Sequence, residues 1–460
     1  MKLGISNRKL LAMAVCLVSS PVFAVDLITV HNLAVESDPQ LQAAAYRKDA
    51  TGENTRQAWA NLLPNLSGSA TRNWGRNTTR IGEVQFGDET SPKTKQYSDI
   101  DTESYSLDLR QSLYSQSNYE NLDIARGQVS QAEAAYNIAY EDFLVRVAGA
   151  YFGVLTAQDG VIFAEAEEKA LQRQYEQAEQ RFEVGLTAVT DVHEARASYD
   201  NARARAIVSR NTLADTKEAV NELTGEYFED YEPLQEVLPL VRPLPDSPDE
   251  WVDIAMKYNP NVVFAQYDVE IADSTVRLQR SGYYPSLDLV ASSNHFTNNK
   301  RTFTSLTGEN FATGEVKNDD HQIGLQLRVP IYQGGVVTSR TRQARYLLNA
   351  VHSDLDQSQR AVARATKNAY RAVIAGIEQV GAFNQAMVSA ESALEATQAG
   401  FEVGTRTIVD VLIAQQRYFQ AQRDNSLARH TYIVDHLRLK AAAGVLATED
   451  LQKVNDILVK

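Results

Sequence analysis

The chain contains two similar stretches of twelve residues, 219 positions apart. They are RFEVGLTAVTDV at 181–192 and GFEVGTRTIVDV at 400–411, with six identical positions. Further pairs match in the same order, such as LLPNLSGSA at 62–70 with YYPSLDLVA at 283–291. Every offset falls between 218 and 221 residues. A constant offset over ordered matches indicates a tandem duplication of a unit of roughly 200 residues.

The duplication predicts the domain organisation. Residues 25–225 form the first repeat and 251–444 the second. They are joined by a linker, 226–250, which carries five prolines. Residues 445–460 form a C-terminal segment. Residues 1–24 have a basic start, a short apolar run and a Val-Phe-Ala end, which is the layout of a secretory signal peptide.

Export limits the chemistry that remains. Cleavage after Ala24 removes the single cysteine, Cys16, together with three positive charges, so the net charge changes from −14 to −17. The mature chain then has no thiol or disulfide. Its acidic balance argues against a nucleic-acid partner. No mature segment looks apolar enough to be a transmembrane helix, whereas the strands of a β-barrel give a weaker signal.

Each repeat predicts two strands. Residues 104–114 and 321–332 carry apolar side chains at every second position, and 64–74 and 285–296 alternate less regularly. The length and period match the strands of a membrane-spanning barrel. A soluble antiparallel sheet with one wet face gives the same pattern, so the pattern alone leaves both open.

Polar segments separate the two strands of each pair. Residues 75–103 and 297–320 are rich in Asn, Thr, Gly and Asp, and we expect them to be long outer loops. Aromatic residues near the expected strand ends would form a girdle at the membrane interface; they are Trp74, Tyr105, Tyr114, Phe296 and Tyr332.

Apolar residues at steps of three and four predict two very long helices, 119–183 and 336–400. Sixty-five residues of helix span about 98 Å. Helices at roughly 30–60 and 187–224 would stack end to end alongside the first of them. Four strands cannot close into a membrane barrel, which needs at least eight, so closure requires several chains. Eight or twelve strands both satisfy this requirement.

The chain gives little support to an enzyme. No phosphate-binding loop, dinucleotide motif or zinc-protease motif is present, and we expect no cofactor and no metal site. His430 and His436 are six residues apart, on different faces of a helix. The pairs Glu167-Glu168 and Asp319-Asp320 are interpreted as solvated surface. An exported coiled-coil scaffold or adaptor without a pore is the remaining alternative.

Three stretches carry a family resemblance: RFEVGLTAVTDVHEARASYD at 181–200, VPIYQGG at 329–335 and VGTRTIVDVL at 403–412. They resemble the TolC family of outer-membrane export channels of Gram-negative bacteria, over nearly the whole mature chain. The resemblance implies an α+β membrane protein. It would be a homotrimer in outer-membrane lipid, with a shared twelve-stranded barrel and a periplasmic coiled-coil tunnel. It also implies partners, namely a periplasmic adaptor and an inner-membrane transporter, and a role in drug efflux or type I secretion.

The twin stretches are then the two helical hairpin tips. Gly185 and Gly404 are expected to end the incoming helices with positive φ, and Thr187 and Thr405 to cap the outgoing ones. The resemblance implies that the exposed tips bind the adaptor through Val184, Gly185, Leu186, Thr187, Val403, Gly404 and Thr405.

The resemblance also implies a gate at these turns. Thr190, Asp191 and Arg406 would belong to the network that holds the inner hairpin closed, and three Asp410 side chains would ring the aperture and attract cations. Two positions depart from the family pattern. Phe401 replaces a tyrosine that ties the hairpins, and Ile413 replaces a second acidic ring, so we expect a gate with fewer ties.

Overall fold

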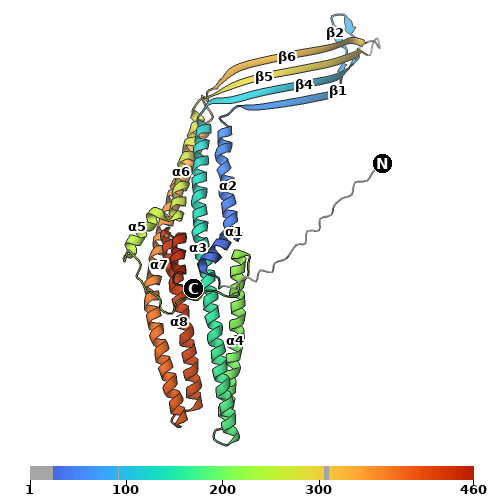
Figure 1. Cartoon of the computed structure of the whole chain (residues 1–460). Helices are drawn as coiled ribbons and strands as arrows, with labels where there is room; N and C mark the ends of the chain where they lie inside the picture. Colours follow the sequence, from blue (N-terminus) through green and yellow to red (C-terminus); the bar gives the residue numbers. More distant parts are fainter. Residues whose placement is uncertain (1–23, 92, 305–309, 460) are drawn as a thin grey trace, which may run out of the picture.

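The computed structural model describes residues 24–91, 93–304 and 310–459, so the expected signal peptide lies outside the described residues except for Ala24. The helices form a long rod, and the strands run off to the side at one end of it (Figure 1). A four-stranded sheet lies at one end, the opposite end consists of two helical hairpins, and the C-terminus lies near the middle. Each repeat supplies two long strands, one very long helix and one hairpin.

The large sheet joins the two repeats. Its strands are antiparallel and follow the order β1-β4-β5-β6, so that the second strand of the first repeat pairs with the first strand of the second. The strands are β1 (Asn65–Ile81), β4 (Thr94–Ser115), β5 (Ser286–Thr304) and β6 (Asn310–Arg328), and a small hairpin between β1 and β4 consists of β2 (Val84–Phe86) and β3 (Glu89–Ser91).

The strands are longer than the sequence pattern predicted. Much of the expected loops 75–103 and 297–320 is strand, and residues 305–309 lie outside the described part. These extensions are polar on both faces, so they carry no apolar period to detect. Their pairing comes from backbone hydrogen bonds and cross-strand ion pairs such as Arg76–Asp99 at 2.6 Å. At its other end β6 stops at Arg328, two residues before Pro330, because proline cannot donate to the ladder.

One face of the sheet is apolar near the helices. Leu66, Leu109, Ala291 and Ile323 are direct partners across the four strands. The exposed fraction of Ile323 is 79%. The intervening positions, such as Asp108, carry mostly polar side chains on the opposite face. This arrangement gives one apolar and one wet face at the level where a barrel would cross lipid.

The expected aromatic girdle needs correction. Trp74 and Tyr105 are exposed on the apolar face but lie within strands rather than at their ends, because the strands continue beyond them. Phe296 pairs with Ser104 and so lies on the polar face. Tyr332 follows the end of β6 and is exposed.

Helices form the rod, and their lengths follow the duplication. The two longest, α3 and α7, run from the sheet to the hairpin tips (Figure 1), and each is followed by a helix of 36 residues. The helices are α1 (Leu27–Ser37), α2 (Pro39–Ala60), α3 (Gln116–Glu183), α4 (Val189–Thr224), α5 (Pro248–Tyr258), α6 (Pro260–Arg280), α7 (Val336–Glu402), α8 (Ile408–Ala443) and α9 (Thr448–Asn455), with one 3-10 turn at Ser281–Tyr283.

The single helix expected over 30–60 is two helices, α1 and α2. The break falls at Asp38-Pro39, where the Asp38 carboxylate accepts hydrogen bonds from the backbone N–H groups of Gln40 and Leu41. Proline at the first position of a helix begins it but cannot continue an earlier one. The second repeat has the same break between α5 and α6, where Asn259 precedes Pro260.

The core lies at mid-length and includes the linker, which packs against the helices instead of merely connecting the repeats. Tyr151 is buried, and its hydroxyl donates to the backbone oxygens of Val25 and Glu232. Burial raises the pKa of Tyr151 above its ordinary value. The equivalent residue in the second repeat, Tyr370, donates to the Asp246 carboxylate at 2.7 Å. The duplicated tyrosines thus fasten both ends of the linker.

In the described part of the chain one helix, α3, contains an 18-residue window long and apolar enough to cross a membrane, contrary to the sequence expectation. Within the protomer 44% of that window is buried. The centre of α3 supplies core residues such as Phe143, Val147 and Tyr151. These core positions account for part of its apolar character.

The two repeats contain a matched pair of helix-ending glycines. Gly225 and Gly444 have φ of +71° and +72°. A Cβ on Gly225 would meet nothing within 4 Å, whereas one on Gly444 would lie 2.4 Å from the Cα of Asn259. We expect Gly225→Ala to cost only the left-handed strain of about 1–2 kcal/mol. Gly444→Ala should lower the thermal unfolding temperature clearly more, because the backbone that begins α6 must move.

Circular dichroism of the two purified variants measures this difference. Equal decreases in unfolding temperature for Gly225→Ala and Gly444→Ala would show that the Gly444–Asn259 contact adds nothing to stability.

Candidate gate at the hairpin tips

Each hairpin turns through a left-handed glycine, as the sequence predicted. Gly185 and Gly404 have φ of +78° and +79°. The backbone N–H of Leu186 donates to Arg181 O and that of Thr405 to Gly400 O, both at 2.8 Å. This is the six-to-one bond of a Schellman motif, which satisfies carbonyls left free at a helix end.

The expected caps are wrong. Helix α4 begins after Ala188, and its first turn has no side-chain cap; the Thr187 hydroxyl instead donates to the Asp191 carboxylate. Helix α8 is capped by Thr407, not Thr405. Thr405 belongs to the end of the incoming helix, where its hydroxyl donates to Gly400 O at 3.0 Å.

Asp410 completes a capping box with Thr407. Its carboxylate accepts the Thr407 backbone N–H at 2.9 Å and the Thr407 hydroxyl at 2.9 Å, and the Asp410 N–H donates back to that hydroxyl. These bonds, the backbone one first, hold the pKa of Asp410 below its ordinary value. Asp410 therefore stays ionised at neutral pH, and protonation in acid would remove both its charge and this part of the cap.

The expected ties of Arg406 do not form within one protomer. Among the described residues, Arg406 makes no hydrogen bond or ion pair with Thr190 or Asp191. Its side chain folds back on the end of α7, where a Cβ placed on Gly400 would lie 2.8 Å from the Arg406 Cγ. Any role of Arg406 in the gate network stays a prediction, because other copies of the chain could supply its partners.

A contact that the sequence interpretation missed joins the two tips. The Arg181 guanidinium lies over the Phe401 ring, 4.7 Å from its centroid. Helices α3 and α7 are thereby linked where the family pattern has a tyrosine. Exposed cation–π contacts of this kind are worth about 0.5–1 kcal/mol. The sequence did hold a signal for this contact. The twin stretches differ at their first position, where Arg181 aligns with Gly400.

An apolar cluster lies directly behind the tips and contains residues of both hairpins. Its buried members come from α3, α4 and α8, and Phe401 of α7 packs against them. They are Leu171, Ala178, Ala195, Ala202, Ile408 and Leu412. Ile413 is outside the cluster, with 43% of the residue exposed. The exposed position of Ile413 leaves room for the charged residue that the family pattern has there.

Glu167 is the largest departure from the sequence interpretation, which placed it on the solvated surface. It is fully buried. Its Oε1 accepts from Arg205 Nη2 of α4 at 2.7 Å, and its Oε2 from Arg423 Nη1 of α8 at 3.0 Å. One carboxylate therefore bonds to both hairpins. Its neighbour Glu168 lies 3.8 Å from Arg210 in a looser pair.

The described residues hold no group of three or more metal-ligating side chains. His430 is buried, and its Nδ1 is 3.0 Å from the Thr156 hydroxyl. Burial, the largest cause, lowers the pKa of His430 to about 4, so the imidazole is neutral at physiological pH. His430 thus belongs to the helix packing.

Comparison with known proteins accounts for this architecture. The model of the family described as outer membrane efflux protein matches residues 30–226 and 251–445, one segment in each repeat. The chain belongs to this family. It is 36% identical to outer membrane protein TolC of Vibrio cholerae, covering 95% of this chain and 94% of that one. It is 31% identical to alkaline protease secretion protein AprF of Pseudomonas aeruginosa, covering 95% and 88%.

Solved structures of other outer-membrane proteins share the fold at lower identity. The outer membrane protein VceC of Vibrio cholerae superposes with a TM-score of 0.71 at 18% identity, covering 91% of this chain and 96% of that chain. The CmeC outer membrane channel of Campylobacter jejuni gives 0.71 at 15% identity, covering 100% and 98%. The family model matches both halves separately, in agreement with the duplication.

The Arg181–Phe401 contact should help keep the tips together. Arg181→Gln and Phe401→Leu each remove it, so we expect single-channel open probability to rise about two- to fivefold for either variant, and no further for the double variant. Phe401→Tyr keeps the ring and should not leak. Arg173→Gln, on the same helix, is the control. Additive effects of the two substitutions would contradict a direct contact.

Removing the buried carboxylate should destabilise the hairpins. Glu167→Ala leaves two arginines without their shared partner, a loss on the order of 3 kcal/mol. Glu168→Ala removes the same chemical group from a looser, partly exposed pair and should cost much less. Thermal unfolding compares the two variants. An unfolding temperature for Glu167→Ala no lower than that of Glu168→Ala would mean that the Glu167 bonds add no stability.

Proposed function

We propose that this protein is the outer-membrane exit duct of tripartite efflux pumps and type I secretion systems. It conducts drugs or proteins passively from an inner-membrane transporter to the exterior of a Gram-negative cell. One observation carries the proposal: a sheet with an exposed apolar face continues directly into a helix of 68 residues, about 102 Å long. The match to the outer membrane efflux protein family and a relative named for alkaline protease secretion favour both kinds of cargo.

Closure of the sheet calls for more than one copy. In the described residues β1 and β6 each have an unpaired edge, and lipid supplies no hydrogen bonds for such an edge. Two copies would make an eight-stranded barrel, whose interior side chains fill. Three copies give twelve strands and leave a lumen. The homotrimer of the resemblance therefore fits a duct.

The gate would lie at the opposite end, where the twin tips converge. Three Asp410 side chains would form an acidic ring that attracts cations, with Thr190, Asp191 and Arg406 as further members of the network and Arg181–Phe401 as a tie within each protomer. Val184, Leu186 and Val403 are largely exposed apolar residues at the tips. With Gly185, Thr187, Gly404 and Thr405 they form the surface proposed to bind a periplasmic adaptor.

The alternative of a soluble scaffold is disfavoured by the sheet. Ile323, Leu325 and Leu327 are each more than half exposed on one face of it. A monomeric soluble protein rarely exposes so continuous an apolar surface.

Single-channel recording in a planar lipid bilayer tests the proposal. We expect a small, cation-preferring current that rises sharply on Arg406→Ser. The control Arg417→Ser makes the same change of charge within α8, away from the turn, and should leave the current unchanged. Ile413→Asp adds a second acidic ring and should strengthen block by a trivalent cation.

The other outcomes separate the parts of the proposal. A large current from the start would keep the channel but show that the gate is already loose. If Ile413→Asp leaves block by the trivalent cation unchanged, the proposed acidic ring is contradicted. Failure to insert under any condition would return the chain to the scaffold alternative.

A further inference from the structure

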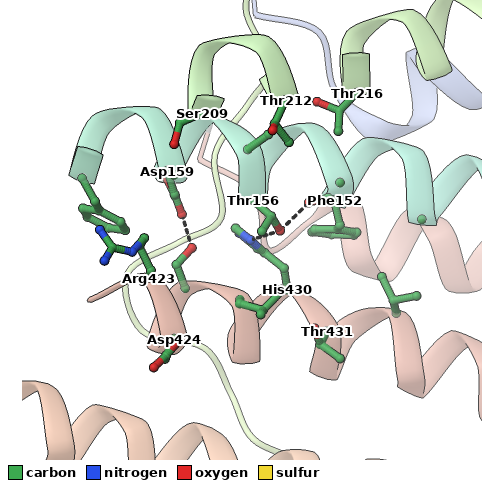
Figure 2. Close-up of a pocket in the computed structure, with 18 of the residues that line it drawn as sticks. Phe152, Thr156, Asp159, Ser209, Thr212, Thr216, Arg423, Asp424, His430 and Thr431 are labelled. Atoms are coloured by element: carbon green, nitrogen blue, oxygen red, sulfur yellow. Dashed lines mark hydrogen bonds between the residues drawn. The ribbon is translucent and has the colours of Figure 1, made fainter. Parts of the chain in front are cut away.

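A cavity of about 540 Å³ lies between α3, α4 and α8, below the sheet and above the tips. Figure 2 shows side chains of these three helices around it. Part of its lining is the backbone of α3 at Gly149, Gly153 and Gly160, where a Cβ would meet nothing within 4 Å. Because glycine has no side chain, these three positions leave open space in the cavity. Its volume is that of sites for drug-sized molecules.

The lining combines apolar and aromatic groups with hydroxyls. Phe152 and Phe163 of α3 and Leu427 and Val434 of α8 supply apolar surface. Helix α4 contributes Ser209, Thr212 and Thr216. Sites for organic ligands have this character, in which apolar walls hold the body of the ligand and a few polar groups orient it.

The charged groups of the cavity differ in whether they have a partner of opposite charge. Both arginines have acidic partners: Arg423 pairs with Glu167 at 3.0 Å and Arg438 with Asp435 at 3.0 Å. Both aspartates have neutral partners. Ser426 donates to Asp159, and Gln420 donates to Asp424 at 2.7 Å.

Within the described part of the chain neither aspartate has a Lys, Arg or His nitrogen within 4.0 Å of its carboxylate. His430 also lines the cavity, and burial keeps it neutral. Arg423 shares Glu167 with Arg205, so the three arginines and four carboxylates at the cavity sum to a charge of −1. The excess charge is therefore negative, and the aromatic rings favour the same kind of partner, because ring faces attract cations.

The cavity lies mainly on the other side of the α3–α8 layer from the linker, and Asp159, Phe163, Ser426 and His430 line both this cavity and a second one next to the linker. The linker lines a second cavity with Leu155, Gln158 and Ile162 of α3, and in Figure 2 it passes behind α3 and α8. In the proposed duct the linker would clothe the outside, and the first cavity would open to the tunnel. This placement rests on the proposed function.

We propose that this cavity is a lumenal binding site for organic cations with an apolar or aromatic body, one site per protomer. The body occupies the space above the α3 glycines, against Phe152 and Phe163, and the positive group lies at the end of the cavity that carries Asp159 and Asp424. Such a site would give the tunnel wall a weak preference among the molecules that pass, in addition to any choice made by the transporter.

Fluorescence polarisation of rhodamine 6G with the detergent-solubilised full protein tests the proposal. We expect saturable binding with one dye per protomer, which anionic fluorescein does not share. Asp159→Asn and Asp424→Asn keep the size and the hydrogen-bond acceptor while removing a charge, and each should weaken binding about tenfold. Asp215→Asn, an exposed aspartate of α4 outside the cavity, should leave binding unchanged.

Filling the cavity is the second arm. Gly153→Leu places a side chain in the open space and should abolish dye binding while keeping the assembly intact by size-exclusion chromatography. If the wild type does not bind the dye and Gly153→Leu breaks the assembly, a neighbouring copy occupies the cavity and the proposal is wrong. Dye binding that is unchanged by Asp159→Asn, Asp424→Asn and Gly153→Leu would also overturn the proposal.

Bilayer current from the same preparation separates the two proposals. A conducting protein that does not bind the dye refutes the cavity site alone, whereas absence of current refutes the duct.

Discussion

An unpaired strand edge cannot lie in lipid, and this constraint governs the rest of the architecture. Each backbone N–H and C=O left unsatisfied in hydrocarbon costs several kcal/mol. The four-stranded sheet has two such edges, at β1 and β6, and its apolar face is suited to lipid only if both are paired. Copies of the same chain offer matching edges. The duplication supports this solution, since each protomer is already two similar hairpins joined edge to edge through β4 and β5.

A different constraint acts at the middle of the rod. There the helices must change from the spacing that matches the wide sheet to close packing with one another. Asp38-Pro39 and Asn259-Pro260 end one helix and begin another at equivalent places in the two repeats. The linker then covers the join, held by Tyr151 and Tyr370. Gly444 lets the end of α8 approach the backbone of Asn259 at this level. Most of the largest fully buried side chains also lie here.

The sequence predicted what depends on period and on local backbone geometry. The long helices, the apolar face of the sheet and the left-handed Gly185 and Gly404 follow from spacing and from the steric freedom of glycine. It could not predict features set by partners distant in the chain. The polar ends of the strands carry no alternation, so only cross-strand pairing reveals them. Glu167 looks like an exposed helix residue until α8, about 256 residues later, brings Arg423 beside it.

The caps failed for a subtler reason: Thr405 and Thr407 both suit a helix start, and the backbone of the preceding turn decides between them. Arg181 was missed because its partner, Phe401, was considered only for the hydroxyl that it lacks. In both cases the twin stretches held the information at the positions where they differ.

The unbroken course of α3 and α7 makes the protomer a lever. Their companions are interrupted at mid-length, but these two helices run from the sheet to the tips without a break. The hairpin below the middle has an arm of 36 residues in α8, about 54 Å. A tilt of about 5° at the top of such an arm moves its tip by roughly 5 Å, simply from its length. Adjustments in the well-packed middle too small to break its contacts could therefore open an aperture at the far end.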